Sequence, residues 1–320
     1  MVRFFYHGKK AKYRIRNWTD YNRSLRMRGS LTFWISQEII DTWIVSEQSG
    51  ERGRSVQYSA AAIIAMASIK FVFRQAGRQT CGLVGSIFEL LKVDLAVPDH
   101  STVSRRMAGV EVGLPLKASG SARHLVIDST GLKVYGEGEW KVRTHGASKR
   151  RTWRKLHLCL DAATGEVVVA GASENSVSDG ELLPEMIEAV EDEIEQVSAD
   201  GADDGRKVYA AFDERKIKPV AIAPRKDAKI WQHGNSRKER LIRDENLRLI
   251  RKKGRAKWKR ESNYHQRSLA ETGVYRFKTI FTDKLQSRKQ ENQFQEMIIK
   301  CAALNRMTHL GMPDSYKVTI

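Results

Sequence analysis

The order of strands and helices between residues 124 and 223 constrains the fold of this 320-residue chain more than any other feature. Short apolar, alternating or β-branched segments at residues 124–127, 155–160 and 166–172 predict three strands, the last two joined as a hairpin. Residues 182–197 have apolar side chains at helical spacing, and further short strands are expected up to Asp200 and within 207–211 and 219–223. This order predicts an α/β fold in which helices flank a mixed sheet.

The first hundred residues are expected to be helical. Residues 57–74 are rich in Ala and Ile without Gly or Pro, and a second helix is expected at 83–93. Asp99 or Ser101 can then cap a short helix that carries Arg105 and Arg106. This order fits a helix-turn-helix near residues 82–108, and a plain helical subdomain is the alternative because the spacer is longer than the usual turn.

Basic residues are concentrated in two separate segments. The chain has 56 Lys and Arg against 38 Asp and Glu, a net charge of +18. Residues 1–30 carry a net +8 and residues 225–260 a net +11, so the remainder is close to neutral at −1. Such clustering is typical of proteins that follow a phosphate backbone and favours a nucleic-acid partner over a merely solvated surface.

Composition excludes several other classes of protein. The longest weakly polar run, residues 60–73, is shorter than the roughly 20 residues of a membrane-spanning helix. Three distant cysteines, Cys81, Cys159 and Cys301, indicate neither a disulfide framework nor a metal site of the C-x-x-C type. We therefore expect a reduced, cytoplasmic protein without membrane association, and the absence of phosphate-binding glycine loops implies no nucleotide cofactor.

Two carboxylates are expected at strand ends. Asp128 follows the first strand and Asp200 the fourth, so they would lie side by side if those strands are neighbours. Like charges at that distance persist only with cations between them, which favours a Mg²⁺ site. Taken singly, either residue is more easily explained as part of a turn, and Asp203 and Asp204 compete with Asp200 for the second position.

A stripe of functional side chains is expected on a later helix. Tyr264, Arg267, Glu271 and Lys278 fall within an arc of about 60° on a helical wheel. The opposite face is expected to pack on the core through its apolar side chains, which are Leu269, Phe277 and Ile280. The stripe suits a carboxylate near metal, with Arg267 and Lys278 holding phosphates.

These residues resemble a known family. The spacing Tyr264-(2)-Arg267-(3)-Glu271-(6)-Lys278 matches the Y-(2)-R-(3)-E-(6)-K signature of the DDE transposases of bacterial insertion sequences. Asp128 in HLVIDSTGLK and Asp200 in SADGADD are similar to that family's two aspartates. The resemblance implies a ribonuclease H-like catalytic domain with two Mg²⁺ ions, replaceable by Mn²⁺, held by the catalytic residues Asp128, Asp200 and Glu271. It implies phosphate-binding roles for Tyr264, Arg267 and Lys278.

Domain boundaries follow from the texture of the chain and from the resemblance. We expect a helical N-terminal DNA-binding region at 1–115, the ribonuclease H-like domain at 116–225 and 262–310, and a tail at 311–320. A basic insertion at 226–261 would interrupt the catalytic domain before its last catalytic helix. The residues of the insertion expected to contact DNA are Lys252, Lys253, Arg255, Lys257, Trp231 and Trp258. The two tryptophans either stack on a flipped base or, as is commoner, anchor the core.

The expected function is that of a DNA transposase. Such an enzyme binds the terminal inverted repeats of an insertion sequence, cuts double-stranded DNA with metal ions and joins the end to target DNA, working as a homo-oligomer in the bacterial nucleoid. A DNA-binding repressor and a structure-specific nuclease of the same fold are the alternatives. A binding protein would not need all three of Asp128, Asp200 and Glu271.

Overall fold

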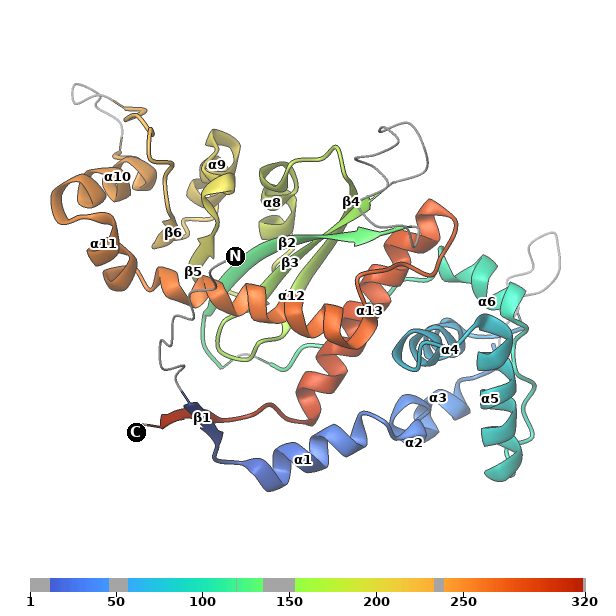
Figure 1. Cartoon of the computed structure of the whole chain (residues 1–320). Coiled ribbons are helices and arrows are strands. Elements are labelled where there is room, and N and C mark those ends of the chain that lie inside the picture. Colours follow the sequence, from blue (N-terminus) through green and yellow to red (C-terminus); the bar gives the residue numbers. More distant parts are fainter. Residues whose placement is uncertain (1–11, 46–56, 119, 135–152, 233–238, 319–320) are drawn as a thin grey trace, which may run out of the picture.

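A five-stranded mixed sheet forms the centre of the computed structural model, which describes residues 12–45, 57–118, 120–134, 153–232 and 239–318 (Figure 1). The strand order is β4-β3-β2-β5-β6. Strands β2, β3 and β4 pair antiparallel, whereas β5 and β6 continue the sheet parallel to β2. The mixed sheet expected from the sequence is confirmed. The strands are β2 (Arg123–Lys133), β3 (Trp153–Asp161), β4 (Val167–Glu174), β5 (Ile194–Ala199) and β6 (Val220–Ile222).

Helices cover both faces of the sheet (Figure 1). Alternate residues of β2 point to opposite faces, so that Leu125 and Ile127 join one apolar cluster and Val126 joins the other. The first cluster lies under α8 (Asp179–Glu188) and α9 (Arg206–Glu214). The second lies under two longer helices, α12 (Ser268–Phe281) and α13 (Gln290–Leu310).

The N-terminal helices share the second of these clusters. Met66 in α4 and Val84 in α5 belong to the same buried core as Val126 in the sheet and Met297 in α13. Ser59 caps α4 by accepting a hydrogen bond from the amide of Ala62 at 3.1 Å. The helices of this region are α1 (Trp18–Met27), α2 (Leu31–Trp34), α3 (Gln37–Asp41), α4 (Ala60–Val72), α5 (Gly77–Leu90) and α6 (His100–Met107).

Helices α5 and α6 contact each other, but residues 91–99 separate them. Of the two residues that the sequence offered as the cap of α6, Asp99 and Ser101, the structure shows Asp99, whose Oδ1 accepts from the amide of Ser101 at 2.8 Å. A connection of this length is not the tight turn of a helix-turn-helix, so that motif stays a prediction.

The basic insertion is built from two short helices. α10 (Ile242–Lys253) ends at Gly254, whose φ of 84° no helix continues, and α11 (Arg255–Glu261) follows at once. The chain then enters a 3-10 turn, η2 (Tyr264–Arg267), which leads into α12. At the other end of the chain, β7 (Ser315–Val318) pairs antiparallel with β1 (Lys12–Ile15).

Two expectations from the sequence are wrong at the level of single elements. The helix expected to reach residue 197 ends at Glu188, because Arg215 donates hydrogen bonds to the carbonyls of Ile187 and Val190 that a longer helix would use. The segment 207–211, expected as a strand, lies in α9. Its buried residues, Val208, Tyr209 and Phe212, have helical spacing.

Within the described ranges, no single helix is long and apolar enough to cross a bilayer. Only α4 and α5 taken together meet the length and composition test, and the pair is bent by 112°. All three cysteines are free thiols, with Cys159 and Cys301 buried.

Candidate active site

Asp128 and Asp200 lie on neighbouring strands. β2 pairs in parallel with β5 up to Val126 opposite Ser198, so two residues further on the two aspartates follow side by side. The sequence could not show whether these two strands are neighbours, and the structure shows that they are. Asp128 does not end its strand, because β2 continues to Lys133 through its pairing with β3. Asp200 follows the last residue of β5 and caps the 3-10 turn η1 (Gly201–Asp203), its carboxylate accepting from the amide of Gly201 at 2.6 Å.

Negative charge accumulates around Asp128. Its carboxylate is half-buried and accepts a hydrogen bond from the amide of Ser129 at 2.9 Å. Burial raises its pKa, the Ser129 hydrogen bond and Arg267 lower it, and the nearby carboxylates of Glu271 and Asp200 raise it further. The net effect is a pKa above the usual range for aspartate, as expected where several carboxylates approach each other.

Glu271 reaches this cluster from α12, which packs on β2 and β3. The helix lies unusually close to the sheet, because a Cβ on Gly273 would stand 2.4 Å from Cδ2 of the buried Leu160. Glycine at this position therefore allows a close approach of helix to strand. Glu271 lies in the first turn of the helix and is largely exposed.

Arg267 is the cation at the centre of the site. Its guanidinium donates a hydrogen bond to Glu271 and also interacts with Tyr264, Asp200 and Asp128. Tyr264 is buried beside Trp258, with the two rings 5.7 Å apart, and burial raises the pKa of its hydroxyl. Among the described residues, Arg267 thus partly offsets the charges of Asp128, Asp200 and Glu271.

The predicted stripe is only partly a continuous helix. Tyr264 and Arg267 belong to η2, and the α-helix begins at Ser268, so the wheel does not describe the first two positions. Lys278 lies about 10 Å along the axis from Glu271, and among the described residues no hydrogen bond or ion pair joins it to the carboxylates. Leu269, expected in the core, is 39% exposed; Phe277 is fully buried, and Ile280 packs against the core.

The two acids that compete with Asp200 have separate environments. Asp204 accepts hydrogen bonds from Arg243 at 2.9 and 3.1 Å, and both side chains are 3% exposed, so this carboxylate is committed to a buried ion pair. Asp203 is 5% exposed, and its Oδ1 has no hydrogen-bond partner in the described part of the chain. Burial and the charge of Asp179 raise its pKa to about 7.

Asp203 is the residue that sequence reasoning undervalued. It lines a small cavity with Asp128, Asp179 and Asp200, next to the buried His157. His157 itself bonds Ser173 at 2.8 Å and is a satisfied structural histidine, as predicted. His145, weighed with it as a weaker candidate, lies outside the described residues. Three aspartates in five residues marked the place, but only burial distinguishes the role of each.

The donor atoms suit a hard divalent cation. Three carboxylates from β2, the end of β5 and α12 interact electrostatically around Asp128, and oxygen donors of this kind are those that Mg²⁺ prefers. The buried Asp203 adds an unpartnered oxygen next to them. In the described ranges, no group of three or more acidic, His or Cys side chains already converges on one point. The residues therefore fit a metal by chemistry and charge, without forming a closed ligand set.

The residues predicted to contact DNA differ in availability. Arg105 and Lys252 are exposed, whereas Arg106 donates to the carbonyl of Tyr58. Three basic side chains of the insertion have partners within the protein: Lys253 and Lys257 pair with Glu261, and Arg255 donates to the carbonyl of Pro224.

The two tryptophans of this region face the protein. Trp258 is 2% exposed and donates to Asn246 at 3.1 Å, so its ring anchors α11 and is not open to a base. Trp231 lies against the guanidinium groups of Arg243 and Arg206, at 4.0 and 4.9 Å from its ring centroid. Both rings therefore contact other parts of the protein, as expected of anchoring residues.

Comparison with known families gives two matches. A family model described as a transposase DDE domain matches residues 119–306, more than half of the chain. A second model with the same description matches residues 26–137. No solved structure matches the chain.

Proposed function

Because the chain belongs to the DDE transposase family, we propose that it binds the terminal inverted repeats of an insertion sequence, cuts the DNA there and transfers the cut end to target DNA. The observation that carries this proposal is the adjacency of Asp128 on β2 and Asp200 at the end of the parallel strand β5, with Glu271 near Asp128. The mixed sheet with helices on both faces supports a ribonuclease H-like catalytic domain.

Each carboxylate has a proposed role. Asp128, Asp200 and Glu271 would hold two Mg²⁺ ions, for which Mn²⁺ can substitute. Bound there, the ions would supply positive charge at the scissile phosphate and a deprotonated water. Arg267 already pairs with Glu271, and we assign it to a phosphate oxygen of DNA once metal offsets the carboxylates. The buried Tyr264 would hold Arg267 in place, and Lys278 would contact a phosphate further along the backbone.

The proposed reaction has two steps, hydrolysis and strand transfer. In the first, the oxygen of a water molecule attacks phosphorus, and the bond to the 3′ oxygen breaks, which leaves a 3′-hydroxyl and a 5′-phosphate. In the second, that hydroxyl attacks a phosphodiester of the target, and the 3′ oxygen of the target strand departs with a proton. No covalent bond to the protein is needed.

The test is Mg²⁺-dependent cleavage and strand transfer with a labelled end of the element and a target plasmid. Asp128→Asn, Asp200→Asn and Glu271→Gln should each abolish both products and retain binding of the end. Asp213→Asn and Glu188→Gln are matched controls, exposed acids of α9 and α8 outside the site. Full activity in any of the three site variants would overturn the assignment. Binding without cleavage by the unmodified protein would indicate a repressor, and cleavage without transfer a nuclease.

A further inference from the structure

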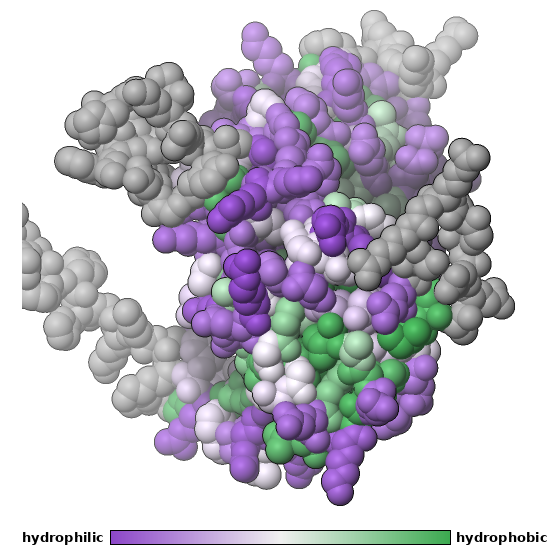
Figure 2. Space-filling view, turned by 90° about the vertical axis from the view of Figure 1, so that its right-hand side faces the viewer, coloured by the Kyte–Doolittle hydropathy of each residue, from purple (hydrophilic) through white to green (hydrophobic). Residues whose placement is uncertain are grey.

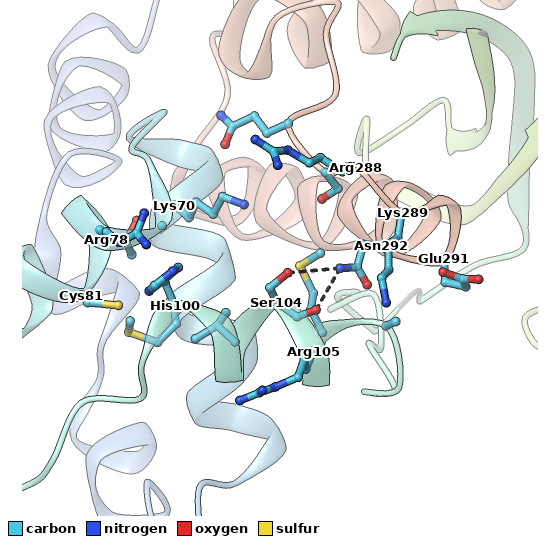
Figure 3. Close-up of a pocket in the computed structure, with 18 residues that line it drawn as sticks. Lys70, Arg78, Cys81, His100, Ser104, Arg105, Arg288, Lys289, Glu291 and Asn292 are labelled. Atoms are coloured by element: carbon cyan, nitrogen blue, oxygen red, sulfur yellow. Dashed lines mark hydrogen bonds between the residues drawn. The ribbon is translucent and has the colours of Figure 1, made fainter. Parts of the chain in front are cut away.

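A second cavity, of about 640 Å³, lies away from the carboxylates between the N-terminal helices and the start of α13 (Figure 3). None of Asp128, Asp200 and Glu271 lines it. The hydrogen bond from Asn292 to the carbonyl of Ser104, at 2.8 Å, joins α13 to α6 at its edge. The cavity is therefore built jointly by two parts of the sequence that are far apart.

The charge of this cavity is strongly positive. Its walls include Lys70, Arg78, Arg105, Arg288 and Lys289, and the acid among its lining residues is Glu291. His100 also lines it but is paired with Asp99 at 3.0 Å. In Figure 3, Lys70, Arg78 and His100 lie on one side and Arg288 and Lys289 on the other. Within the described ranges, none of Lys70, Arg78, Arg288 and Lys289 forms an ion pair. Burial lowers the pKa of Lys70, the buried carboxylate of Glu296 partly offsets this, and an anion in the cavity would raise the pKa further.

Backbone and hydroxyl groups add to the anion-binding character. α13 and α5 both begin at this cavity, with Lys289 and Ala76 as the residues before their first turns. Helix N-termini present free amides and positive partial charge to anions. Ser287, which lines the cavity and is 8% exposed, has a buried Oγ without a partner in the described part of the chain.

The size and the remaining walls select among anions. The cavity falls within the range of about 300 to 1,000 Å³ that encloses drug-sized ligands. It is too large for a phosphate ion alone, and a DNA duplex is far too wide to enter it. Met66, Val103 and Met107 give it apolar walls. A phosphate joined to a base, whose ring faces can pack on apolar side chains, satisfies both halves of the lining.

We propose that this cavity binds an unpaired nucleotide of a DNA strand, its phosphate against Arg78 and Arg288 and its sugar and base against Met66, Val103 and Met107. The inference rests on the proposed action on DNA. A strand is favoured over a free nucleotide because Arg288 and Lys289, which line the cavity, are exposed, so its positive charge reaches the outer surface. Figure 2 shows this face of the molecule, with hydrophilic side chains over its upper part and a hydrophobic group in its lower part.

The test uses binding without cleavage, in EDTA. Anisotropy is measured with labelled 12-nucleotide oligo(dT) and with a blunt duplex of the same length, for the unmodified protein and for Arg78→Ala/Arg288→Ala. The control, Lys207→Ala/Lys317→Ala, removes the same charge from exposed positions outside the cavity and outside both basic segments. We expect the cavity variant to lose about tenfold in affinity for oligo(dT), with a salt slope reduced by about 0.7 per lost phosphate contact. Duplex affinity should fall by less than twofold, as should both affinities of the control.

Cys81 supplies a second readout. It lines the cavity and is partly exposed, whereas Cys159 and Cys301 are buried, so alkylation by iodoacetamide reports on this site. Oligo(dT) should slow alkylation in the unmodified protein and have no such effect in the cavity variant. Equal losses for single strand and duplex would mean an outer contact with duplex backbone, and protection by dTMP as strong as by oligo(dT) would mean a free-nucleotide site; either overturns the inference. Unchanged binding in the cavity variant overturns it alone, while failure of the unmodified protein to bind any DNA would remove the proposed function as well.

Discussion

Neutralising Asp204 should lower the stability of the protein, whereas neutralising Asp200 should abolish its activity and leave its stability almost unchanged. Asp204 accepts two hydrogen bonds from the buried Arg243, whereas Asp200 is exposed and caps only a 3-10 turn. Removing one partner of a buried ion pair costs about 3 to 5 kcal/mol, since the remaining charge is left without compensation. Arg243 keeps a contact to Asp244 at 3.2 Å, which places Asp204→Asn near the lower end, at about 3 kcal/mol.

Asp200→Asn should leave stability almost unchanged. Asparagine retains an acceptor for the amide of Gly201, so we expect a change within about 0.5 kcal/mol. Urea denaturation followed by circular dichroism measures both values, and Asp227→Asn is a control for an exposed acid at the start of the insertion. The cleavage assay then completes the contrast: Asp200→Asn is stable and inactive, whereas Asp204→Asn is destabilised and, at low temperature, still active. An inactive Asp204→Asn of normal stability would exchange the two assignments and refute the reasoning.

Two further predictions concern charge. Burial raises the pKa of Asp203 to about 7 from 3.8, so the ionised form is disfavoured in the folded state. The protein therefore loses stability as the pH rises from about 4 to 7. In EDTA, Asp203→Asn should stabilise the protein by up to roughly 4 kcal/mol at pH 8 and by less than about 2 kcal/mol at pH 5. A gain independent of pH, measured by urea denaturation, would contradict this. The second prediction concerns the basic positions of the insertion, Lys252, Lys253, Arg255 and Lys257. Neutralising them should weaken binding of transposon ends and reduce the slope of log affinity against log salt by about 0.9 per lost phosphate contact. An unchanged slope would show that these side chains do not touch DNA.

The parts of the fold predicted correctly are those with a strong local pattern. Alternating residues and a turn predict the hairpin of β3 and β4, and a capping residue predicts the start of α6. The end of α8 could not be predicted, because it depends on hydrogen bonds from Arg215, more than twenty residues further along the chain. Local periodicity does not record such tertiary contacts.

The site shows the same division. Strand-end positions and the family resemblance pointed to Asp128, Asp200 and Glu271, whose catalytic role stays a prediction. The pairing of β2 with β5 supplied the adjacency of the two aspartates, which no spacing contains. Asp203 and Asp204 differ in environment because Arg243, which lies in the insertion, forms an ion pair with Asp204 and not with Asp203. Likewise, the tryptophans of the insertion are chemically suited to stacking, and only their burial and partners show what they contact.

The apolar cluster shared by α4, α13 and the sheet has a consequence for engineering. Chimaeras that join residues 1–115 of this protein to the catalytic part of a relative would bring together two halves of one hydrophobic core that were not selected to fit. Misfitted core side chains typically cost about 1 to 3 kcal/mol each, enough to unfold a marginally stable enzyme before any change of DNA preference could be scored. A test of the predicted DNA-binding role of this region should therefore exchange exposed side chains of α5 and α6 and leave Met66, Val84 and their neighbours intact.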